Sequence, residues 1–172
     1  MKIFFASIGA FVVLIIGLLL WSSLYGPAAQ GPRPLMGEKM PDQGFAHIDR
    51  GQTHADYNSN PPTSGPHWGD DVAGAGVKSQ QAPDELILHS MEHGAAVVWY
   101  RADLPQDQIE KIQAAFDAAK VRKKIMTPRA GLDVPVALTS WGYLLKLDAT
   151  DAEKITGFIL ANNDRGPEKA PI

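Results

Sequence analysis

The residues most able to do chemistry in this sequence are its histidines, which gather in one stretch of the chain. There are five, and all of them precede Gly94: His47, His54, His67, His89 and His93. The chain has no cysteine, which excludes disulfides, thiol nucleophiles, iron–sulfur clusters and thiolate metal ligands. Imidazole nitrogen and methionine sulfur are then the ligands left for a transition metal ion. The clustering therefore predicts a metal site in this stretch.

Four candidate ligands lie in the five-residue run His89-Ser90-Met91-Glu92-His93. On a helix, His89 and His93 share a face and could bind one ion, whereas on a strand they would stand about 13 Å apart. Gly94 and the apolar run after it indicate a turn or bend, which still allows ligands to converge. Met91 is either a thioether ligand or a core residue that fills a gap.

The other histidines lie in or before a segment rich in turn-forming residues. His67 follows Pro61, Pro62 and Pro66, whose fixed φ angles would hold a ligand in one orientation. His47 and His54 precede this loop, and position alone leaves each of them equally able to be a ligand or an exposed polar residue.

The ligand types allow three functions. A histidine and methionine set without thiolate favours copper first and zinc second, and metal binding or delivery is the default role. The run also matches H-x-x-E-H, a zinc-peptidase signature in which the glutamate is the general base, so an envelope hydrolase that uses Glu92 is an alternative. In the third, a non-catalytic envelope interaction module, the histidines only hydrogen-bond loop to sheet.

The N-terminus predicts a membrane segment. Ile3 to Trp21 is apolar without a charge or a proline, and a helix of about 20 such residues spans a bilayer core. Its length favours an uncleaved anchor over a cleavable signal peptide, although Pro27-Ala28-Ala29 offers a weak cleavage site. Either interpretation places the rest of the chain outside the cytoplasm. The anchor would make a single-pass inner-membrane protein with its N-terminus inside and a periplasmic domain.

The length and net charge of the chain limit its number of domains and its possible partners. The chain has 172 residues and a formal net charge of -3, which lacks the basic excess that nucleic-acid binding requires. We expect an anchor over residues 1–25, a Pro/Gly-rich linker over 26–44 and one extracytoplasmic domain over 45–168. Protein partners and any substrate cannot be identified from the sequence.

The pattern of apolar residues predicts an α+β domain in which two helices cover a small sheet. Buried strands are expected at Leu86 to His89 and Ala95 to Tyr100, followed by a helix from Pro105 to Lys120. Further strands are expected at Lys124 to Thr127 and Val134 to Leu147, the second bent near Gly142. The last helix opens with the capping-box spacing of Thr150 to Glu153 and ends near Asn162 and Asn163. The core order is strand, helix, strand, strand, helix.

Three segments carry a family resemblance: Tyr57 to His67, His89 to Gly94 and Ala137 to Gly142. Over roughly Phe45 to Glu168 the chain resembles the bacterial family named domain of unknown function 3105, whose members are membrane-anchored or exported proteins without an assigned activity. The resemblance implies site histidines at His54, His67, His89 and His93 and a site glutamate at Glu92. Many members carry leucine where this chain has Met91. The candidate metal ligands are therefore His54, His67, His89, His93, Glu92 and Met91.

Overall fold

The computed structural model describes residues 13–22, 24 and 32–172. The chain divides into two units, Met1–Arg33 and Pro34–Ile172. In the first unit, residues 13–22 are helical. Among the described residues, no helix has both the length and the apolar character needed to cross a membrane. The predicted anchor from Ile3 to Trp21 falls partly on residues 1–12, which lie outside the described part.

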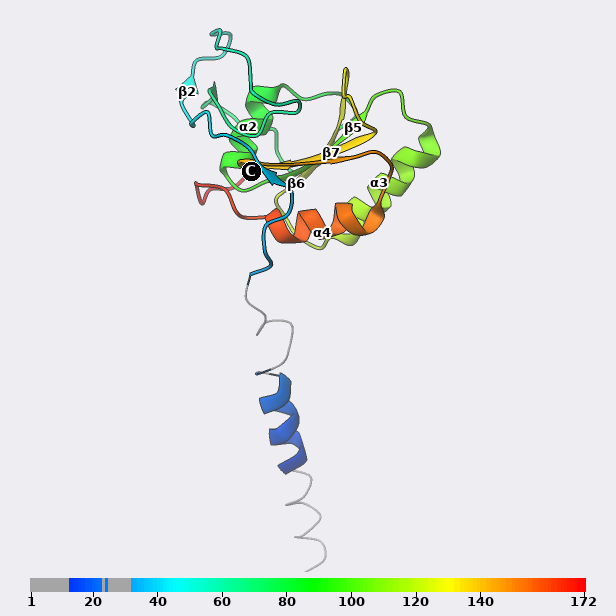
Figure 1. The fold of residues 1–172 in the computed structure, drawn as a ribbon. Helices are drawn as coiled ribbons and strands as arrows, with labels where there is room; N and C mark the ends of the chain where they lie inside the picture. Colours follow the sequence, from blue (N-terminus) through cyan, green and yellow to red (C-terminus); the bar gives the residue numbers. More distant parts are fainter. Residues whose placement is uncertain (1–12, 23, 25–31) are drawn as a thin grey trace, which may run out of the picture. The chain divides into compact units, whose positions relative to one another are not determined.

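A mixed sheet of six strands forms the centre of the second unit, which confirms the predicted α+β class (Figure 1). The strand order is β1-β8-β7-β5-β6-β4, with β4, β5 and β6 parallel and the other neighbours antiparallel. The strands are β1 (Glu38–Lys39), β4 (Gly76–Val77), β5 (Ala96–Arg101), β6 (Lys124–Arg129), β7 (Val136–Ser140) and β8 (Tyr143–Leu147). A separate parallel pair joins β2 (His47–Ile48) to β3 (His67–Trp68).

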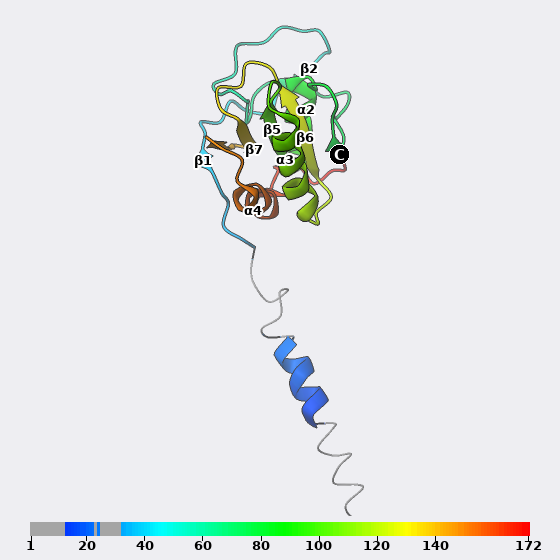
Figure 2. The same ribbon diagram turned by 90° about the vertical axis from the view of Figure 1, so that its right-hand side faces the viewer.

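Helices cover both faces of the sheet, as Figures 1 and 2 show. The predicted pair, α3 (Gln106–Ala118) and α4 (Ala152–Asn162), lies on one face. A third helix, α2 (Asp84–Glu92), lies on the other. Side chains alternate along a strand, so Val98 of β5 packs toward α3 and α4, whereas Trp99 packs toward α2. Burial on both sides explains why β5 is apolar from Ala96 to Tyr100.

The segment from Leu86 to His89, predicted as a strand, is instead part of α2. Asp84 and Glu85 occupy the first turn, where carboxylates stabilise a helix N-terminus. At the other end Gly94 has φ +98°, a left-handed conformation that commonly ends helices. The apolar run was too short for its periodicity to distinguish strand from helix, and these end signals decide it.

Two smaller predictions also need correction. The region Val134 to Leu147, predicted as one bent strand, is the hairpin of β7 and β8, in which Ser140 pairs with Tyr143. Gly142 between them has φ +72°, a left-handed conformation that glycine adopts without strain. The N-cap of α4 is Asp151, not Thr150, because Asp151 Oδ1 accepts a hydrogen bond from Lys154 N–H at 3.0 Å.

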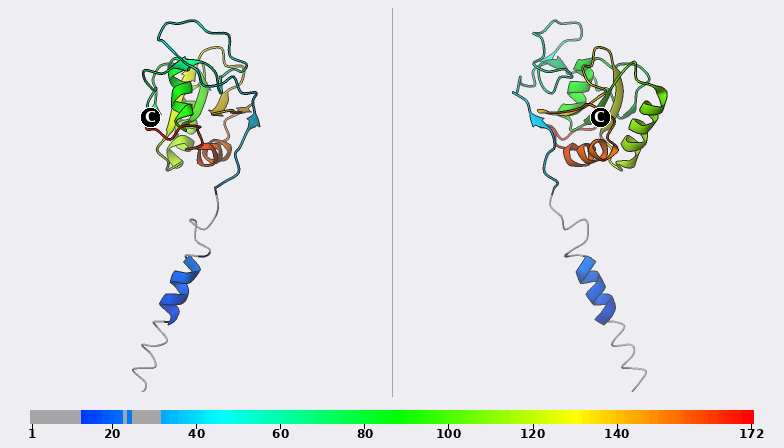
Figure 3. Two further views of the ribbon diagram at one scale, coloured as in Figure 1. Left: turned by 90° about the vertical axis from the view of Figure 1, so that its left-hand side faces the viewer. Right: turned by 45° about the vertical axis from the view of Figure 1, so that its right-hand side comes forward.

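Both ends of the second unit are held on the domain. Asn162 Oδ1 accepts from Met36 N–H at 3.0 Å, and Asn162 Nδ2 donates to Met36 O at 3.0 Å. The part of the predicted linker from Pro34 onward therefore belongs to this compact unit. After α4, the C-terminal segment (residues 164–172) returns alongside the C-terminal end of α2, shown in red in Figure 3.

Gly94 offers a test of how tightly this C-terminal segment packs. A Cβ at Gly94 would lie 2.9 Å from Asp164 Cα, whereas one at Gly131, also at positive φ, would meet nothing. We expect Gly131→Ala to lower the free energy of unfolding by about 1–2 kcal/mol through backbone strain alone. Gly94→Ala should cost about 1–3 kcal/mol more through the added clash. Urea unfolding followed by tryptophan fluorescence measures both, and equal losses would contradict the packing.

Candidate metal centre

Helix α2 supplies two residues of the site from its last turn. His89 and Glu92 are three residues apart, so both project from the same side of the helix. Their side chains are almost fully buried, with relative exposures of 6% for His89 and 4% for Glu92. Below them Ile87, Leu88 and Met91 pack into the core against the sheet, which fixes the rotation of the helix and therefore the direction of the two polar side chains.

The pairing of β2 with β3 brings two further histidines together. In this parallel ladder His47 lies opposite His67, and side chains at paired positions lie on the same face. His67 is fully buried, while the side chain of His47 is 48% exposed at the rim. The ring of His47 packs on Gly69, where a Cβ would lie only 2.7 Å from His47 Cγ. Any larger residue at position 69 would therefore displace this ring.

These four side chains converge on one point. Glu92 Oε2 lies 3.0 Å from Nε2 of His47 and 3.0 Å from Nε2 of His67. The ring of His89 lies 5.0 Å from that of His47 and 5.3 Å from that of His67, between centroids. One potential ligand atom from each of His47, His67, His89 and Glu92 lies within 4.8 Å of every other. The group, called the inner site below, could hold one metal ion.

Backbone carbonyls determine which nitrogen each buried ring presents. A carbonyl oxygen only accepts, so a ring nitrogen that contacts one carries the hydrogen. His67 donates in this way from Nδ1 to Gly65 O at 2.9 Å, and His89 from Nδ1 to Asp71 O at 2.7 Å. The neutral form of either ring then has its lone pair on Nε2. Metal-binding histidines in proteins are oriented in the same manner.

The inner site encloses a buried carboxylate whose negative charge needs compensation. Among the described residues, no lysine or arginine forms an ion pair with Glu92, whose side-chain partners are the imidazoles of His47 and His67. A buried carboxylate is costly unless a positive charge compensates it. Burial, together with the neighbouring imidazoles, lowers the pKa of His89, which favours the neutral ring that binds metals. A proton or a metal ion between Glu92 and these rings would satisfy both sides.

The six predicted ligands separate into four places. His67, His89 and Glu92 are in the inner site. His93 belongs to a second group with Glu92 and Glu168. Met91 is fully buried in the hydrophobic cluster between α2 and the sheet. His54 is in neither group, because its Nε2 lies 3.3 Å from Glu85 Oε1 and its Nδ1 contacts Ala55 O.

Sequence reasoning did not select two members of these groups. Sequence position does not distinguish His47 from His54, and the family resemblance favours His54. Only the β2–β3 ladder places His47 beside His67, and strands of two residues leave no periodic signal. Glu168 lies far along the chain in the C-terminal segment, and nothing in its sequence neighbourhood indicates a ligand.

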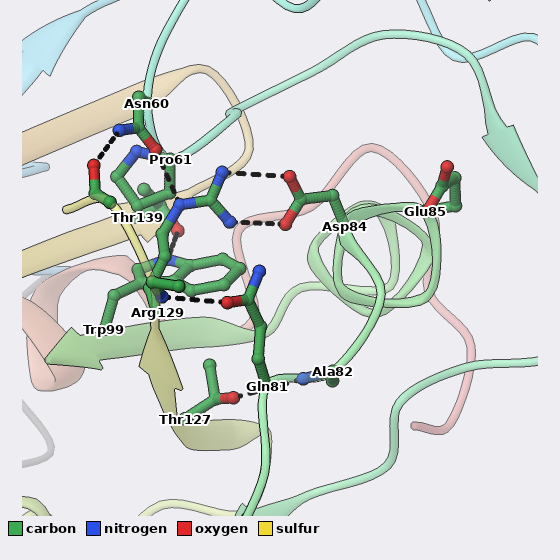
Figure 4. Close-up of polar contacts among 12 residues, drawn as sticks. Asn60, Pro61, Gln81, Ala82, Asp84, Glu85, Trp99, Thr127, Arg129 and Thr139 are labelled. Carbon is green, nitrogen blue, oxygen red and sulfur yellow. Dashed lines mark hydrogen bonds and ion pairs between the residues drawn. The ribbon is translucent and has the colours of Figure 1, made fainter. Parts of the chain in front are cut away.

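A network around Arg129 holds the elements that carry the site (Figure 4). Arg129 of β6 donates to both carboxylate oxygens of Asp84, at 2.5 and 3.0 Å, at the start of α2. Its Nε donates to Asn60 Oδ1 at 2.6 Å, in the loop that leads to His67. The guanidinium also lies over the ring of Trp99, 4.9 Å from the centroid. Arg129 thus ties the helix and the loop that supply ligands to the sheet.

A cavity of about 370 Å³ opens beside the inner site. Its walls are His47, Ile48, Asp49, Arg50, Gly69 and Asp70. Arg50 donates to both carboxylate oxygens of Asp70, at 3.1 and 3.2 Å. His47 belongs both to the cavity wall and to the ligand group, so the inner site can be reached from solvent through this residue.

Replacing Arg129 tests the network. Arg129→Met leaves the partly buried Asp84 carboxylate without its partner, and we expect the free energy of unfolding to fall by about 1–3 kcal/mol. Arg101→Met is the matched control, because Arg101 pairs with Asp103 in a more exposed position and such pairs contribute less than about 1 kcal/mol. Urea unfolding of both variants measures the difference. Equal effects would show that the Arg129 network has no special role.

Comparison with known proteins identifies a family and no annotated relative. Residues 47–171 match the family described as "Protein of unknown function (DUF3105)", as the resemblance implied. No curated protein and no solved structure matches the chain. The match covers the inner site, the Arg129 network and most of the C-terminal segment. The chain belongs to the DUF3105 family.

Proposed function

We propose that this protein binds a divalent transition metal ion in the inner site through His47, His67, His89 and Glu92. The observation that carries the proposal is the orientation of the buried rings. Nδ1 of His67 and of His89 each donates to a backbone carbonyl, so that the lone pair of His67 Nε2 faces a carboxylate oxygen at 3.0 Å. Two acceptors at this distance repel each other unless a proton or a metal ion lies between them, and a metal ion would bind both.

The donor set narrows the choice of metal. The expectation of copper first rested on a methionine ligand, and Met91 lies in the hydrophobic core instead. Three imidazole nitrogens and one carboxylate oxygen suit zinc, and they also suit copper in its divalent state. Zinc and copper(II) are thus the two ions to compare.

The number of protein ligands favours binding over catalysis. Catalytic zinc sites keep an open position with three protein ligands, whereas sites with four are closed. A hydrolase would need Glu92 as a base beside a metal-bound water, but Glu92 lies among the ligands, 3.0 Å from two imidazole nitrogens. Helix α2 also ends at Glu92, which leaves no long helix for such a site. Half-exposed His47 gives the ion a route of exchange through the adjoining cavity.

Two histidine variants test the proposal. His89→Gln keeps polarity and much of the side-chain volume but removes an inner-site ligand, whereas His54→Gln alters a histidine outside it. Loss of a group that only orients a ligand costs about 10–100-fold in metal affinity, so we expect His89→Gln to lose at least about 100-fold and His54→Gln to bind as wild type. Competition with a chromophoric chelator measures affinity for zinc and copper(II), using untagged full-length protein in mild detergent.

Any other outcome would contradict the proposal. Circular dichroism first establishes that both variants are folded. A wild-type chain that binds neither ion would make the histidines structural members of an interaction domain. Equal losses in both variants would move the site away from α2.

For the location, we propose that the segment from Ile3 to Trp21 anchors the chain in the cytoplasmic membrane, with the metal-binding domain outside the cytoplasm. The support is the length and apolarity of the segment. It follows that the metal would be taken up from the extracytoplasmic space.

The proposed anchor can be tested by introducing charged residues into it. Each lysine at the centre of a membrane helix costs about 2.5–3.5 kcal/mol. In a bacterial host, Val13→Lys/Ile16→Lys should therefore release the chain from carbonate-washed membranes, and Val13→Leu/Ile16→Leu should not. External protease should reach the wild-type domain in spheroplasts. A protected domain would contradict the proposed orientation, and a shortened soluble product would indicate a cleaved signal peptide.

A further inference from the structure

A second group of potential ligands adjoins the inner site and shares one of its residues. It consists of Glu92, His93 and Glu168, with one ligand atom from each within 4.8 Å of the others. Glu92 and His93 are buried, while the side chain of Glu168 is 51% exposed. The rings of His89 and His93 lie 4.5 Å apart between centroids. The two groups are therefore neighbours.

The backbone places Glu168 at this point through specific contacts. Glu168 N–H donates to Glu92 O at 3.0 Å, and Asp164 N–H donates to Gly94 O at 2.8 Å. Between them the chain passes so close to α2 that a Cβ at Gly166 would lie 2.1 Å from Glu92 O. Only glycine permits this approach. The C-terminal segment is thus fitted to the end of α2, and Glu168 is held beside Glu92.

His93 is oriented in the same way as the buried rings of the inner site. Its Nδ1 donates to Pro171 O at 2.7 Å, which leaves the lone pair of the neutral ring on Nε2. That nitrogen faces Glu168 Oε2 at 3.5 Å. His93 is 9% exposed, so a buried imidazole lone pair faces the Glu168 carboxylate. The Glu92 carboxylate belongs to the same group, and two neighbouring carboxylates repel unless a proton or a cation lies between them.

We propose that Glu92, His93 and Glu168 form a second metal position and that the Glu92 carboxylate bridges it to the inner site. This inference rests on the proposed function. Glu92 Oε2 contacts His47 and His67, which leaves Oε1 for the second ion. With three protein ligands and a half-exposed Glu168, the second position keeps room for water or an exchanging ligand. It is the more open of the two and takes the same class of divalent ion as the inner site.

Metal stoichiometry tests the second position. Full-length protein without a histidine tag is stripped with a chelator, dialysed at a fixed excess of free zinc and analysed for zinc per chain. We expect two zinc ions in the wild type and one in Glu168→Gln, which removes a charge at the exposed ligand. Glu153→Gln is the control, because Glu153 is an exposed carboxylate on α4, and it should retain two.

The outcomes separate this inference from the function on which it rests. One zinc ion in the wild type would overturn the second position and leave the inner site standing, whereas none would overturn both. Two ions in Glu168→Gln would overturn the assignment of Glu168. One ion in Glu153→Gln would show that any loss of surface charge has the same effect, and would also overturn it.

Copper(II) gives a second readout that reports on the bridge. Ions that share a carboxylate lie about 3.5–4 Å apart, so their unpaired electrons couple and broaden the electron paramagnetic resonance signal. We expect this broadening in wild-type protein with two copper(II) ions and a narrow, isolated signal from Glu168→Gln. Two bound copper ions with isolated signals would show that Glu92 does not bridge them.

Discussion

The Glu92 carboxylate is the constraint on which the rest of this structure depends. It is 4% exposed at the end of a helix, and its side-chain partners in the inner site are imidazoles. Such a group costs free energy unless a positive charge compensates it. The surrounding chain places histidines from three separate segments around it, and backbone carbonyls accept from Nδ1 of the two buried rings, so that Nε2 carries the lone pair of each neutral ring. The interior is therefore arranged around a buried polar cluster and not only around apolar packing.

The elements that carry the ligands are short, so their positions depend on contacts with the larger sheet. Strands β2 and β3 have two residues each and could not persist alone. Arg129 compensates for this by binding Asp84 at the start of α2 and Asn60 in the loop before His67. Because Arg129 lies on β6, the six-stranded sheet sets the distance between helix and loop. The α3–α4 face supplies most of the large core residues, and the α2 face carries the chemistry.

The sequence predicts those features that depend on neighbouring residues, and it does not predict those that depend on contacts between distant residues. The helix α3, the end of α4 and the α+β class follow from local periodicity and were predicted. The clustering of histidines indicated a site, and His67, His89 and Glu92 lie together in it. His47 could not be chosen over His54, because that choice depends on a ladder between distant two-residue strands. Glu168 and Arg129 act through contacts with residues 76 and 45 positions away, which no local pattern records.

The shape of the site indicates how it would handle a metal ion. His67, His89 and Glu92 are buried and oriented, so they would hold an ion with little reorganisation. The ligands that reach solvent are His47, on a cavity wall, and Glu168, on the C-terminal segment. Exposed ligands can dissociate while the buried ones remain bound. An ion could therefore enter or leave by stepwise exchange at His47 or at Glu168, without any opening of the core. This distinguishes the centre from a purely structural site, in which every ligand is enclosed, and it agrees with the proposed role in binding and passing on a metal ion.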